Sequence, residues 1–319
     1  MKTILIAEKT TAETRAQLLE AASDRVKLVF AETQAVTRGQ VLACDALIGN
    51  VDPALLSDAP RLQWVQLVSS GADVYAGYDP IRSAFTLTTA TGAYGVGIAE
   101  YMVCMLLVMM KKIPTYLDQQ KDRVWHDAGE VCSPMGKRVL VVGTGNLGTE
   151  FARRMRPFGC TIVGIRRRAG ACPEGFDAVR TMEALVEELP QADVVALCLP
   201  GTPETYHLFD REMLARCKPG AFLMNVGRGT VIPREALLDS ALIGRFGGVW
   251  VDVLENEPLP DGDALFGVEK LTITPHITGG WHLDETRKRI FALCTENLRR
   301  WLQDEPLTSV LDWSTGYCR

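Results

Sequence analysis

Three ionisable residues follow candidate strands in the second half of the chain. Arg228 stands in NVGRGTVI, Glu257 in DVLENEPLP and His276 in TPHITGG. Arginine can hold a carboxylate through paired hydrogen bonds, and histidine can carry a proton near neutral pH. A carboxylate beside a histidine favours the charged form of the imidazole. Together, residues of these types could bind a small carboxylic acid and donate a proton to a reacting oxygen atom.

Each of these residues also has an ordinary structural interpretation. A lone histidine after a strand is more often structural, Glu257 lies in an acidic loop flanked by proline, and Arg228 could pair locally. Of the four histidines, His276 is the one in a strand-end motif, and His282 in GGWHLDE is the second candidate. The other two are interpreted as loop residues: His126 and His207. The catalytic hypothesis therefore depends on the three motifs occurring together.

A glycine-rich turn, GTGNLG at residues 143–148, precedes these motifs and lies between the apolar run RVLVV and a helical pattern. Gly143 would make the tight turn, Gly145 would let the backbone approach a pyrophosphate, and Gly148 would let helix and strand pack closely. The helix N-terminus would offer N–H groups to the phosphates. A glycine triplet alone could be an ordinary turn, but between a strand and a helix it predicts a nicotinamide dinucleotide site.

The next predicted strand, TIVGI, ends in three arginines: Arg166, Arg167 and Arg168. An enzyme that uses NAD usually has Asp or Glu at this point, about 20 residues after the turn. A carboxylate would repel a 2′-phosphate, whereas arginine binds one through charge-assisted hydrogen bonds. The arginines therefore favour NADP as the cofactor. NAD, bound beside a solvated basic turn, is the alternative.

Short β-branched runs alternate with helical patterns, and these elements must position the residues above. In the first half, strands are predicted over Thr3–Ala7, Val26–Phe30, Ala46–Gly49 and Trp64–Val68, with a helix over Thr11–Ala22. After Pro134, six strands are predicted: Val139–Val142, Thr161–Ile165, Val194–Leu199, Ala221–Val226, Gly248–Val253 and Leu271–Thr274. Helices are predicted between them over Leu147–Phe158, Met182–Glu188 and Arg234–Ile243. The alternation predicts an α/β fold with doubly wound parallel sheets, the second with the strand count of a dinucleotide-binding sheet.

The composition is that of an ordinary globular protein. The 319 residues suggest about two domains, and the net charge of −5 argues against general binding to nucleic acid or to an anionic membrane. Nine scattered cysteines without a C-x-x-C motif fit thiols in a reducing compartment and no metal site. The most apolar stretch, Ile98–Met110, is too short to span a bilayer, and MKTILIAEKTTAE does not resemble a signal peptide. We therefore expect a cytoplasmic protein.

The chain resembles the D-isomer-specific 2-hydroxyacid dehydrogenases. The motifs that carry the resemblance are, in order, Ser69–Asp73 (SSGAD), Ala99–Leu107 (AEYMVCMLL), GTGNLG, Leu199–Leu208 (LPGTPETYHL), Cys217–Gly229 (CKPGAFLMNVGRG), DVLENEPL and TPHITGG. The resemblance implies hydride transfer between NAD(P)H and a small 2-keto acid or D-2-hydroxy acid. It implies that Arg228 binds the substrate carboxylate, that His276 is the acid–base group, and that Glu257 pairs with His276 and tunes its acidity.

The resemblance also implies further contacts. Cofactor contacts are expected from the turn and the strand ends that follow it: Asn146, Leu147, Leu199, Pro200, Thr205, Val226, Asp252 and Gly279. Asp252 is expected to accept a hydrogen bond from the nicotinamide carboxamide. The backbone of Ser70 and Gly71 is expected to hold the substrate carboxylate with Arg228. The chain departs from the family at Gly95, where many members have threonine against the cofactor, and in the bulky Trp281.

The family architecture implies a discontinuous, flavodoxin-like substrate domain over residues 1–97 and 284–319, with a Rossmann-type cofactor domain over residues 98–283. The helix predicted over Thr286–Leu302 would then return to the first domain. Members are generally homodimers, which we also expect here. The same fold serves co-repressors that sense a dinucleotide and bind partners, and these keep the three catalytic residues. Glu257 argues against formate dehydrogenase, where this position tends to be Gln. The sequence does not identify the 2-keto acid.

Overall fold

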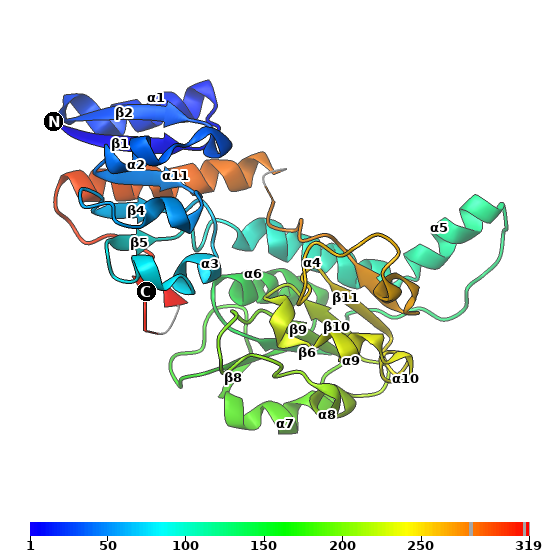
Figure 1. The fold of residues 1–319 in the computed structure, drawn as a ribbon. Helices are drawn as coiled ribbons and strands as arrows, with labels where there is room; N and C mark the ends of the chain where they lie inside the picture. Colours follow the sequence, from blue (N-terminus) through cyan, green and yellow to red (C-terminus); the bar gives the residue numbers. More distant parts are fainter. Residues whose placement is uncertain (281–282, 315–316, 319) are drawn as a thin grey trace. The chain divides into compact units, whose positions relative to one another are not determined.

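The computed structural model describes residues 1–280, 283–314 and 317–318. It divides into two compact units (Figure 1). The first contains Met1–Tyr94 and Trp281–Arg319, and the second contains Gly95–Gly280. The boundaries thus fall after residues 94 and 280 rather than after the expected residues 97 and 283.

The first unit is built on a five-stranded parallel sheet. Its strands are β1 (Lys2–Ala7), β2 (Val26–Ala31), β3 (Ala46–Gly49), β4 (Trp64–Gln66) and β5 (Thr86–Thr88). They lie in the order β2-β1-β3-β4-β5, which is the flavodoxin-like order. The sequence did not predict β5, which has only three residues. A two-stranded antiparallel sheet near the C-terminus pairs β13 (Leu311–Asp312) with β14 (Tyr317–Cys318).

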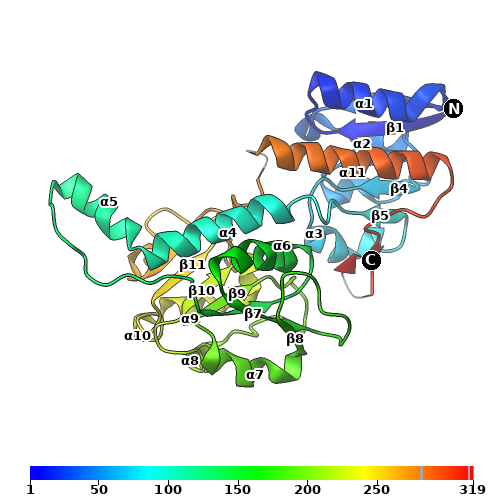
Figure 2. The same cartoon turned by 180° about the vertical axis from the view of Figure 1, so that it is seen from behind.

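Helices cover both faces of this sheet. On one face, α1 (Ala12–Ala22) packs beside α11 (Asp284–Leu302), as both views show (Figures 1 and 2). Residues of both helices join one apolar cluster with the sheet, including Leu18, Ile290 and Leu298. The cluster on the other face takes in residues of the short helices α2 (Arg38–Leu42) and α3 (Asp73–Ala76). The amphipathic pattern of α11 therefore completes a core that the N-terminal segment leaves open.

A buried polar network fastens α11 to the sheet. Asn297 Nδ2 donates to Gln66 Oε1 at 2.7 Å, and Thr88 Oγ1 donates to the same oxygen at 2.8 Å. Trp64 Nε1 in turn donates to Thr88 Oγ1 at 2.9 Å. The Thr308 N–H donates to Asn297 Oδ1 at 2.9 Å, which adds the segment after the helix. Buried polar groups are costly unless they are paired, so this network specifies how α11 docks.

The second unit is built on a seven-stranded parallel sheet. Its strands are β6 (Arg138–Val142), β7 (Thr161–Arg166), β8 (Ala178–Thr181), β9 (Val194–Leu197), β10 (Phe222–Asn225), β11 (Gly248–Val251) and β12 (Leu271–Ile273). The order β12-β11-β10-β9-β6-β7-β8 is that of a dinucleotide-binding sheet with one strand added beyond β11. The six-strand prediction missed β8, a partly exposed edge strand.

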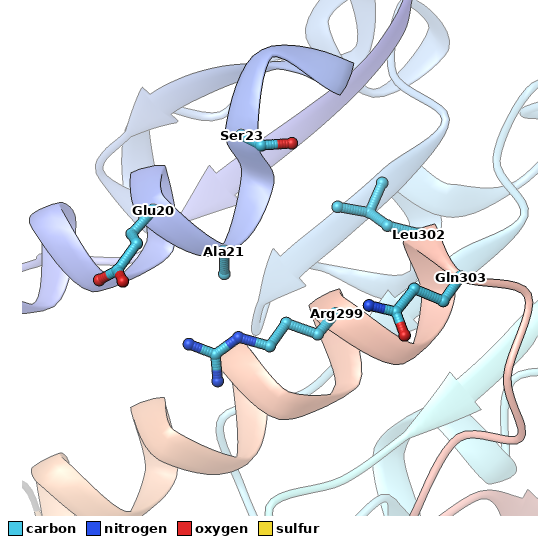
Figure 3. A pocket seen from close by; sticks show the side chains of 6 residues that line it. All are labelled: Glu20, Ala21, Ser23, Arg299, Leu302 and Gln303. Atoms are coloured by element: carbon cyan, nitrogen blue, oxygen red, sulfur yellow. The ribbon is translucent and has the colours of Figure 1, made fainter.

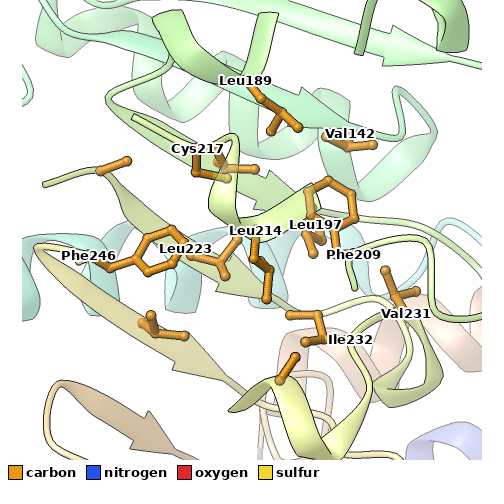
Figure 4. Packing of buried hydrophobic residues seen from close by; sticks show 14 of the residues in the cluster. Val142, Leu189, Leu197, Phe209, Leu214, Cys217, Leu223, Val231, Ile232 and Phe246 are labelled. Atoms are coloured by element: carbon orange, nitrogen blue, oxygen red, sulfur yellow. The ribbon is translucent and has the colours of Figure 1, made fainter. Parts of the chain in front are cut away.

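Two helices cover one face of the seven-stranded sheet and four shorter ones cover the other. The first face carries α4 (Gly95–Met110) and α6 (Asn146–Met155). The second face carries α7 (Leu185–Glu188), α8 (Arg211–Ala215), α9 (Arg234–Leu238) and α10 (Ser240–Ile243), over the apolar cluster in Figure 4. The single helix expected over Arg234–Ile243 is therefore wrong. Asp239 separates α9 from α10 and accepts hydrogen bonds from the first N–H groups of α10.

One further helix, α5 (Ile113–Asp122), was not predicted and projects away from the sheet of its own unit in both views (Figures 1 and 2). Each of its ten residues is at least partly exposed. Among the described residues, no helix is both long and apolar enough to cross a membrane.

Candidate active site

The glycine-rich turn lies between β6 and α6, as predicted. Gly143 has a φ of +105°, and a Cβ atom there would lie 2.5 Å from the carbonyl oxygen of Cys198. A Cβ at Gly148 would overlap with the carbonyl oxygen of Gly143, so α6 packs directly on the turn. By contrast, a Cβ at Gly145 would meet nothing within 4 Å. The turn therefore needs glycine at 143 and 148 for packing, while 145 borders open space.

This open space fits the phosphates of a dinucleotide. Gly145 is the N-cap of α6 and supplies no side-chain hydrogen bond to the first turn. The N–H groups at the start of α6, which include those of Asn146 and Leu147, are thus available to a bound anion. An exposed helix N-terminus with a glycine approach is the arrangement that a pyrophosphate requires.

Gly95, where the chain departs from the family, lies where the start of α4 approaches the start of α6. A Cβ atom at Gly95 would overlap with Oδ1 of Asn146. The start of α4 and the start of α6 thus approach so closely that the Asn146 side chain fills the volume of a residue-95 side chain. A larger residue at 95 would have to displace the Asn146 side chain within the second unit.

The three arginines differ from one another in the structure. Arg166 is the last residue of β7, whereas Arg167 and Arg168 are exposed. The Nε and Nη2 atoms of Arg166 are buried and have no hydrogen-bond partner among the described residues. A Cβ at Gly170 would lie 2.8 Å from Nη2, so the loop after β7 folds over the guanidinium group. Buried unpaired donors are costly, and a phosphate group would satisfy them.

The segment after β9 was predicted to line the adenosine. Leu199 is buried in the core, and Thr205 is buried as well. Thr205 Oγ1 donates to the Pro200 carbonyl at 2.6 Å and accepts from the Thr202 N–H at 2.9 Å, so this loop is braced from within. The contacts of Leu199, Pro200 and Thr205 with a cofactor remain predictions.

Glu257 and His276 form a direct pair. His276 Nδ1 lies 2.7 Å from Glu257 Oε2, and the Leu254 N–H donates to Glu257 Oε1 at 2.7 Å. The side chains are 53% and 34% exposed, respectively. Because Nδ1 faces the carboxylate, Nε2 is the ring atom that can exchange a proton with a substrate. His276 has a φ of +50°, and its N–H donates to the Asp252 carbonyl at 2.9 Å.

Asp252 is buried and braces the segment around His276. Its carboxylate accepts from Thr274 Oγ1 (2.5 Å), the Ile277 N–H (3.1 Å), the Thr278 N–H (3.2 Å) and Thr278 Oγ1 (2.6 Å). A carboxylate has about four acceptor positions, so the expected bond from a carboxamide would have to replace one of these. That bond stays a prediction.

Two other residues were expected to contact the cofactor. Val226 is buried and follows β10. Gly279 lies in the turn in which the Gly280 N–H donates to the Ile277 carbonyl.

Arg228 follows β10, and its described contacts connect it with the Glu257 loop through the backbone. Arg228 Nη1 donates to the Gly227 carbonyl at 2.8 Å, and Asn225 Nδ2 donates to the Arg228 carbonyl at 3.0 Å. A Cβ at Gly229 would overlap with the backbone of Leu254. Since β10, β11 and β12 are adjacent and parallel, Arg228, Glu257 and His276 all follow strand ends at one edge of the sheet.

Ser70 and Gly71 lie in the first unit, after the carboxyl end of β4. Ser69 Oγ donates to the Gly71 carbonyl at 2.7 Å, and Thr91 Oγ1 donates to the Ser70 carbonyl at 3.4 Å. These bonds hold the loop in a defined turn, and its contact with a substrate stays a prediction. Trp281 and His282 lie outside the described residues.

The structure contains a second histidine–carboxylate pair that the sequence analysis missed. His207 Nε2 lies 2.7 Å from Glu255 Oε1. The two residues are 48 positions apart and no local pattern connects them, so His207 was interpreted as a loop residue. The pocket in Figure 3, between the ends of α1 and α11, is lined by none of the predicted site residues. Within the described part of the chain, no group of three or more His, Cys, Asp or Glu side chains could hold a metal ion.

Comparisons with known proteins agree on one family. The family profile described as D-isomer specific 2-hydroxyacid dehydrogenase, NAD binding domain, matches residues 103–278. A glyoxylate reductase of Korarchaeum cryptofilum is 31% identical over 271 residues, covering 81% of this chain and 80% of that protein. A D-isomer specific 2-hydroxyacid dehydrogenase family protein from Aeromonas salmonicida has a solved structure that is 32% identical, with a TM-score of 0.86, over 98% of this chain and 99% of that chain.

A second solved structure, of a D-isomer specific 2-hydroxyacid dehydrogenase from Xanthobacter autotrophicus in complex with NADPH and MES, is 25% identical, with a TM-score of 0.83, over 99% of each chain. The matched profile spans more than half of this chain, and the relatives span most of the rest. The two sheet orders agree with this assignment. The chain therefore belongs to the D-isomer specific 2-hydroxyacid dehydrogenase family of NAD(P)-dependent oxidoreductases.

Proposed function

We propose that this enzyme reduces small 2-keto acids to D-2-hydroxy acids with NADPH, and that His276 is its acid–base group. The observation that carries the proposal is the 2.7 Å contact between His276 Nδ1 and Glu257 Oε2, at the edge of the sheet that carries the glycine turn. This contact leaves Nε2 outside the pair, on a side chain that is 53% exposed, and gives the imidazole a carboxylate partner. Glyoxylate and hydroxypyruvate are the first substrates to test, because relatives carry those names.

Each residue has a defined part in this reaction. The glycine turn and Arg166 would hold the nicotinamide dinucleotide, which when bound would supply the hydride for the carbonyl carbon. Arg228, with the backbone of Ser70 and Gly71, holds the substrate carboxylate and polarises the keto oxygen. His276 donates the Nε2 proton to that oxygen as the alcohol forms and becomes neutral. In the reverse direction it takes the same proton back, and Glu257 holds the ring through Nδ1 in both directions.

The first test is a steady-state assay of 2-keto acid reduction by the full chain. We expect turnover with at least one of glyoxylate, hydroxypyruvate and larger 2-keto acids, and formation of the D-enantiomer where the product is chiral. NADPH binding without turnover of any of them would contradict the proposal and favour a dinucleotide-sensing binding protein. Dinucleotide binding itself is measured separately by fluorescence titration.

We propose NADPH as the preferred cofactor because of Arg166. Its buried and unpaired Nε and Nη2 atoms lie at the end of β7, where the 2′ group of a dinucleotide is recognised. A hydrogen bond to a charged group contributes about 1.5–3 kcal/mol, which is roughly 10-fold to 100-fold in kcat/KM. We expect Arg166→Asp to lose that factor with NADPH and to keep or gain activity with NADH.

Arg168→Asp is the matched control for this test, because it makes the same charge change at an exposed neighbouring position. It should alter the NADPH to NADH ratio much less than Arg166→Asp. A preference of the unmodified enzyme for NADH would contradict the NADP assignment without touching the assignment of His276.

We also propose that the enzyme is a homodimer and that α5 and the segment after it contact the second copy. This arm exposes several large apolar side chains: Leu117, Val124, Trp125 and Val131. Trp125 is fully exposed. Grouped apolar side chains of this kind are typical of protein interfaces. Sedimentation should give a dimer that Trp125→Ser weakens, while Phe266→Ser, an exposed apolar residue elsewhere in the unit, should leave it intact.

A cytoplasmic location is the last element of the proposal. All nine cysteines are free thiols, including the buried Cys44, Cys217 and Cys294. Free thiols in this number fit a reducing compartment. Cell fractionation with an antibody against the chain tests the location directly.

A further inference from the structure

The loop over residues 254–257 carries Glu257 and is held from two sides. On one side, Glu257 contacts His276, as described above. On the other side, Glu255 Oε1 lies 2.7 Å from His207 Nε2, and Glu255 Oε2 accepts from the Arg234 N–H at 3.2 Å. Alternate glutamates of one short loop thus bind two different histidines.

His207 is itself firmly placed. Its backbone adopts a φ of +52°, and its N–H donates to the Thr230 carbonyl at 2.8 Å. The ring of Tyr206 stacks on the imidazole, with the ring centroids 3.9 Å apart. The Tyr206 hydroxyl also donates to Glu255 Oε1 at 3.4 Å. The side chains of His207 and Glu255 are 30% and 20% exposed, so the pair is more covered than the His276–Glu257 pair.

The contacts of the loop reach all three proposed catalytic residues. A Cβ at Gly229, the residue after Arg228, would overlap with the backbone of Leu254, so the loop lies directly against that segment. Leu254 in turn supplies the N–H that orients Glu257 Oε1. A shift of residues 254 and 255 would therefore move the donor that aligns the Glu257 carboxylate toward His276.

From these contacts we infer that His207 and Glu255 are positioning residues, which hold the 254–257 loop so that Glu257 stays aligned with His276 next to Arg228. The expected effect on catalysis rests on the proposed function, whereas the expected effect on the position of Glu257 does not. We call the contact between His207 and Glu255 the clamp, and both residues act through Glu257. A misplacement of about 1 Å at an active site can cost about 100-fold in rate, so a clamp of this kind has a measurable effect.

The test compares His207→Ala, which removes the clamp, with His207→Gln, which keeps a hydrogen-bond donor for Glu255. The matched control is Glu212→Ala on α8, which removes one partner of an exposed ion pair with Arg216, away from the loop. We expect His207→Ala to lower kcat by about 10-fold to 100-fold with little change in the KM for NADPH. His207→Gln should restore most of kcat, and Glu212→Ala should match the unmodified enzyme.

A second readout does not depend on turnover. The chain has four histidines, so NMR spectra recorded at one fixed pH can follow the ring signals of His276 in each variant. We expect the His276 Cε1 proton signal to move in His207→Ala, because the contact between its ring and Glu257 changes, and to stay in place in Glu212→Ala. If the enzyme reduces no 2-keto acid but this signal moves, the clamp stands and the proposed function fails.

The inference is overturned if His207→Ala leaves both kcat and the His276 ring signal unchanged, even if it lowers the melting temperature. Glu255→Gln provides the second variant in case His207→Ala does not fold, since it keeps the shape of the side chain and removes its charge. It should lower kcat and move the His276 ring signal, as His207→Ala does. No shift in either quantity would again contradict the inference.

Discussion

The two histidine–carboxylate pairs share one loop and one contact distance, yet they differ in which ring nitrogen makes the contact and in how exposed the histidine is. In the first pair, His276 uses Nδ1, which leaves Nε2 outside the contact, and 53% of its side chain is exposed. In the second pair, His207 uses Nε2, lies under the ring of Tyr206 and is 30% exposed. The orientation of the ring and the covering of the pair therefore separate a group suited to proton transfer from one suited to holding a loop.

The two carboxylates differ as well. Burial raises the pKa of Glu255, but the hydrogen bonds from His207 and the Arg234 N–H, together with the charge of His207, outweigh it and leave the pKa below its ordinary value of 4.5. Both of its oxygens bind groups of the surrounding structure. Glu257 binds one backbone N–H of its own loop, and its other oxygen faces His276. Glu255 thus holds the loop in place, while Glu257 contacts the proposed acid–base residue His276.

The largest expected effect comes from His276→Gln. General acid–base catalysis by a positioned side chain contributes about 100-fold to 10,000-fold, so kcat for 2-keto acid reduction should fall by that factor. NADPH should still bind with an unchanged Kd, because the glycine turn is untouched. Turnover within a few fold of the unmodified enzyme would contradict the proposal that His276, and not His207, transfers the proton.

Glu257→Gln should have the next largest effect. The amide can still bind the imidazole, but it carries no negative charge toward Nδ1. We expect kcat to fall by about 10-fold to 100-fold, while the Kd for NADPH stays unchanged. A kcat within a few fold of the unmodified enzyme would contradict this role.

The coupling between the pairs is expected to be smaller and can be measured with a double-mutant cycle. Glu255→Gln and Glu257→Gln are combined, and kcat is compared with the product of the two single effects. Residues in one network show interaction energies of about 0.5–3 kcal/mol. If Glu255 acts only through Glu257, the double variant should be little worse than Glu257→Gln alone. Strictly multiplicative effects would show that Glu255 acts independently.

The smallest effect concerns stability and pH. The pKa of Glu255 is lower in the folded chain than in the unfolded chain, so its contribution is present above pH 4.5 and is lost as the pH falls through the folded value. The unmodified enzyme should therefore melt about 2–4 °C above Glu255→Gln near neutral pH, and this gap should shrink as the pH falls below 4.5. A gap that stays constant across this range would contradict the ion pair.

The strongly patterned parts of the fold were predictable. Continuous apolar runs indicated the central strands, and the switch to helical spacing after Gly148 indicated α6. The missed elements lack such patterns. The strand β8 reads AVRT at a partly exposed edge, β5 has three residues, and α5 has exposed residues throughout. Elements that bury little carry little hydrophobic periodicity, so single-sequence patterns do not mark them.

The site shows the same division. His276 and Glu257 stand in motifs, and their pairing was expected from family resemblance rather than from physics alone. His207 and Glu255 come together because two loops meet after strands β9 and β11, and a 48-residue separation leaves no local signal. Similarly, only the structure separates the buried Arg166 from its exposed neighbours, because a run of three arginines looks uniform in sequence.

The docking of α11 has a consequence for the order of events on the ribosome. Gln66 and Asn297, which meet in the buried network, are 231 residues apart in the chain. At about 5–20 residues per second, roughly 10 to 50 s pass between the synthesis of the two. The second unit is continuous over Gly95–Gly280 and is completely synthesised within that interval. Until its last helix is made, the first sheet has only α1 on that face and leaves part of its apolar surface uncovered, so the nascent chain is exposed to aggregation during this interval.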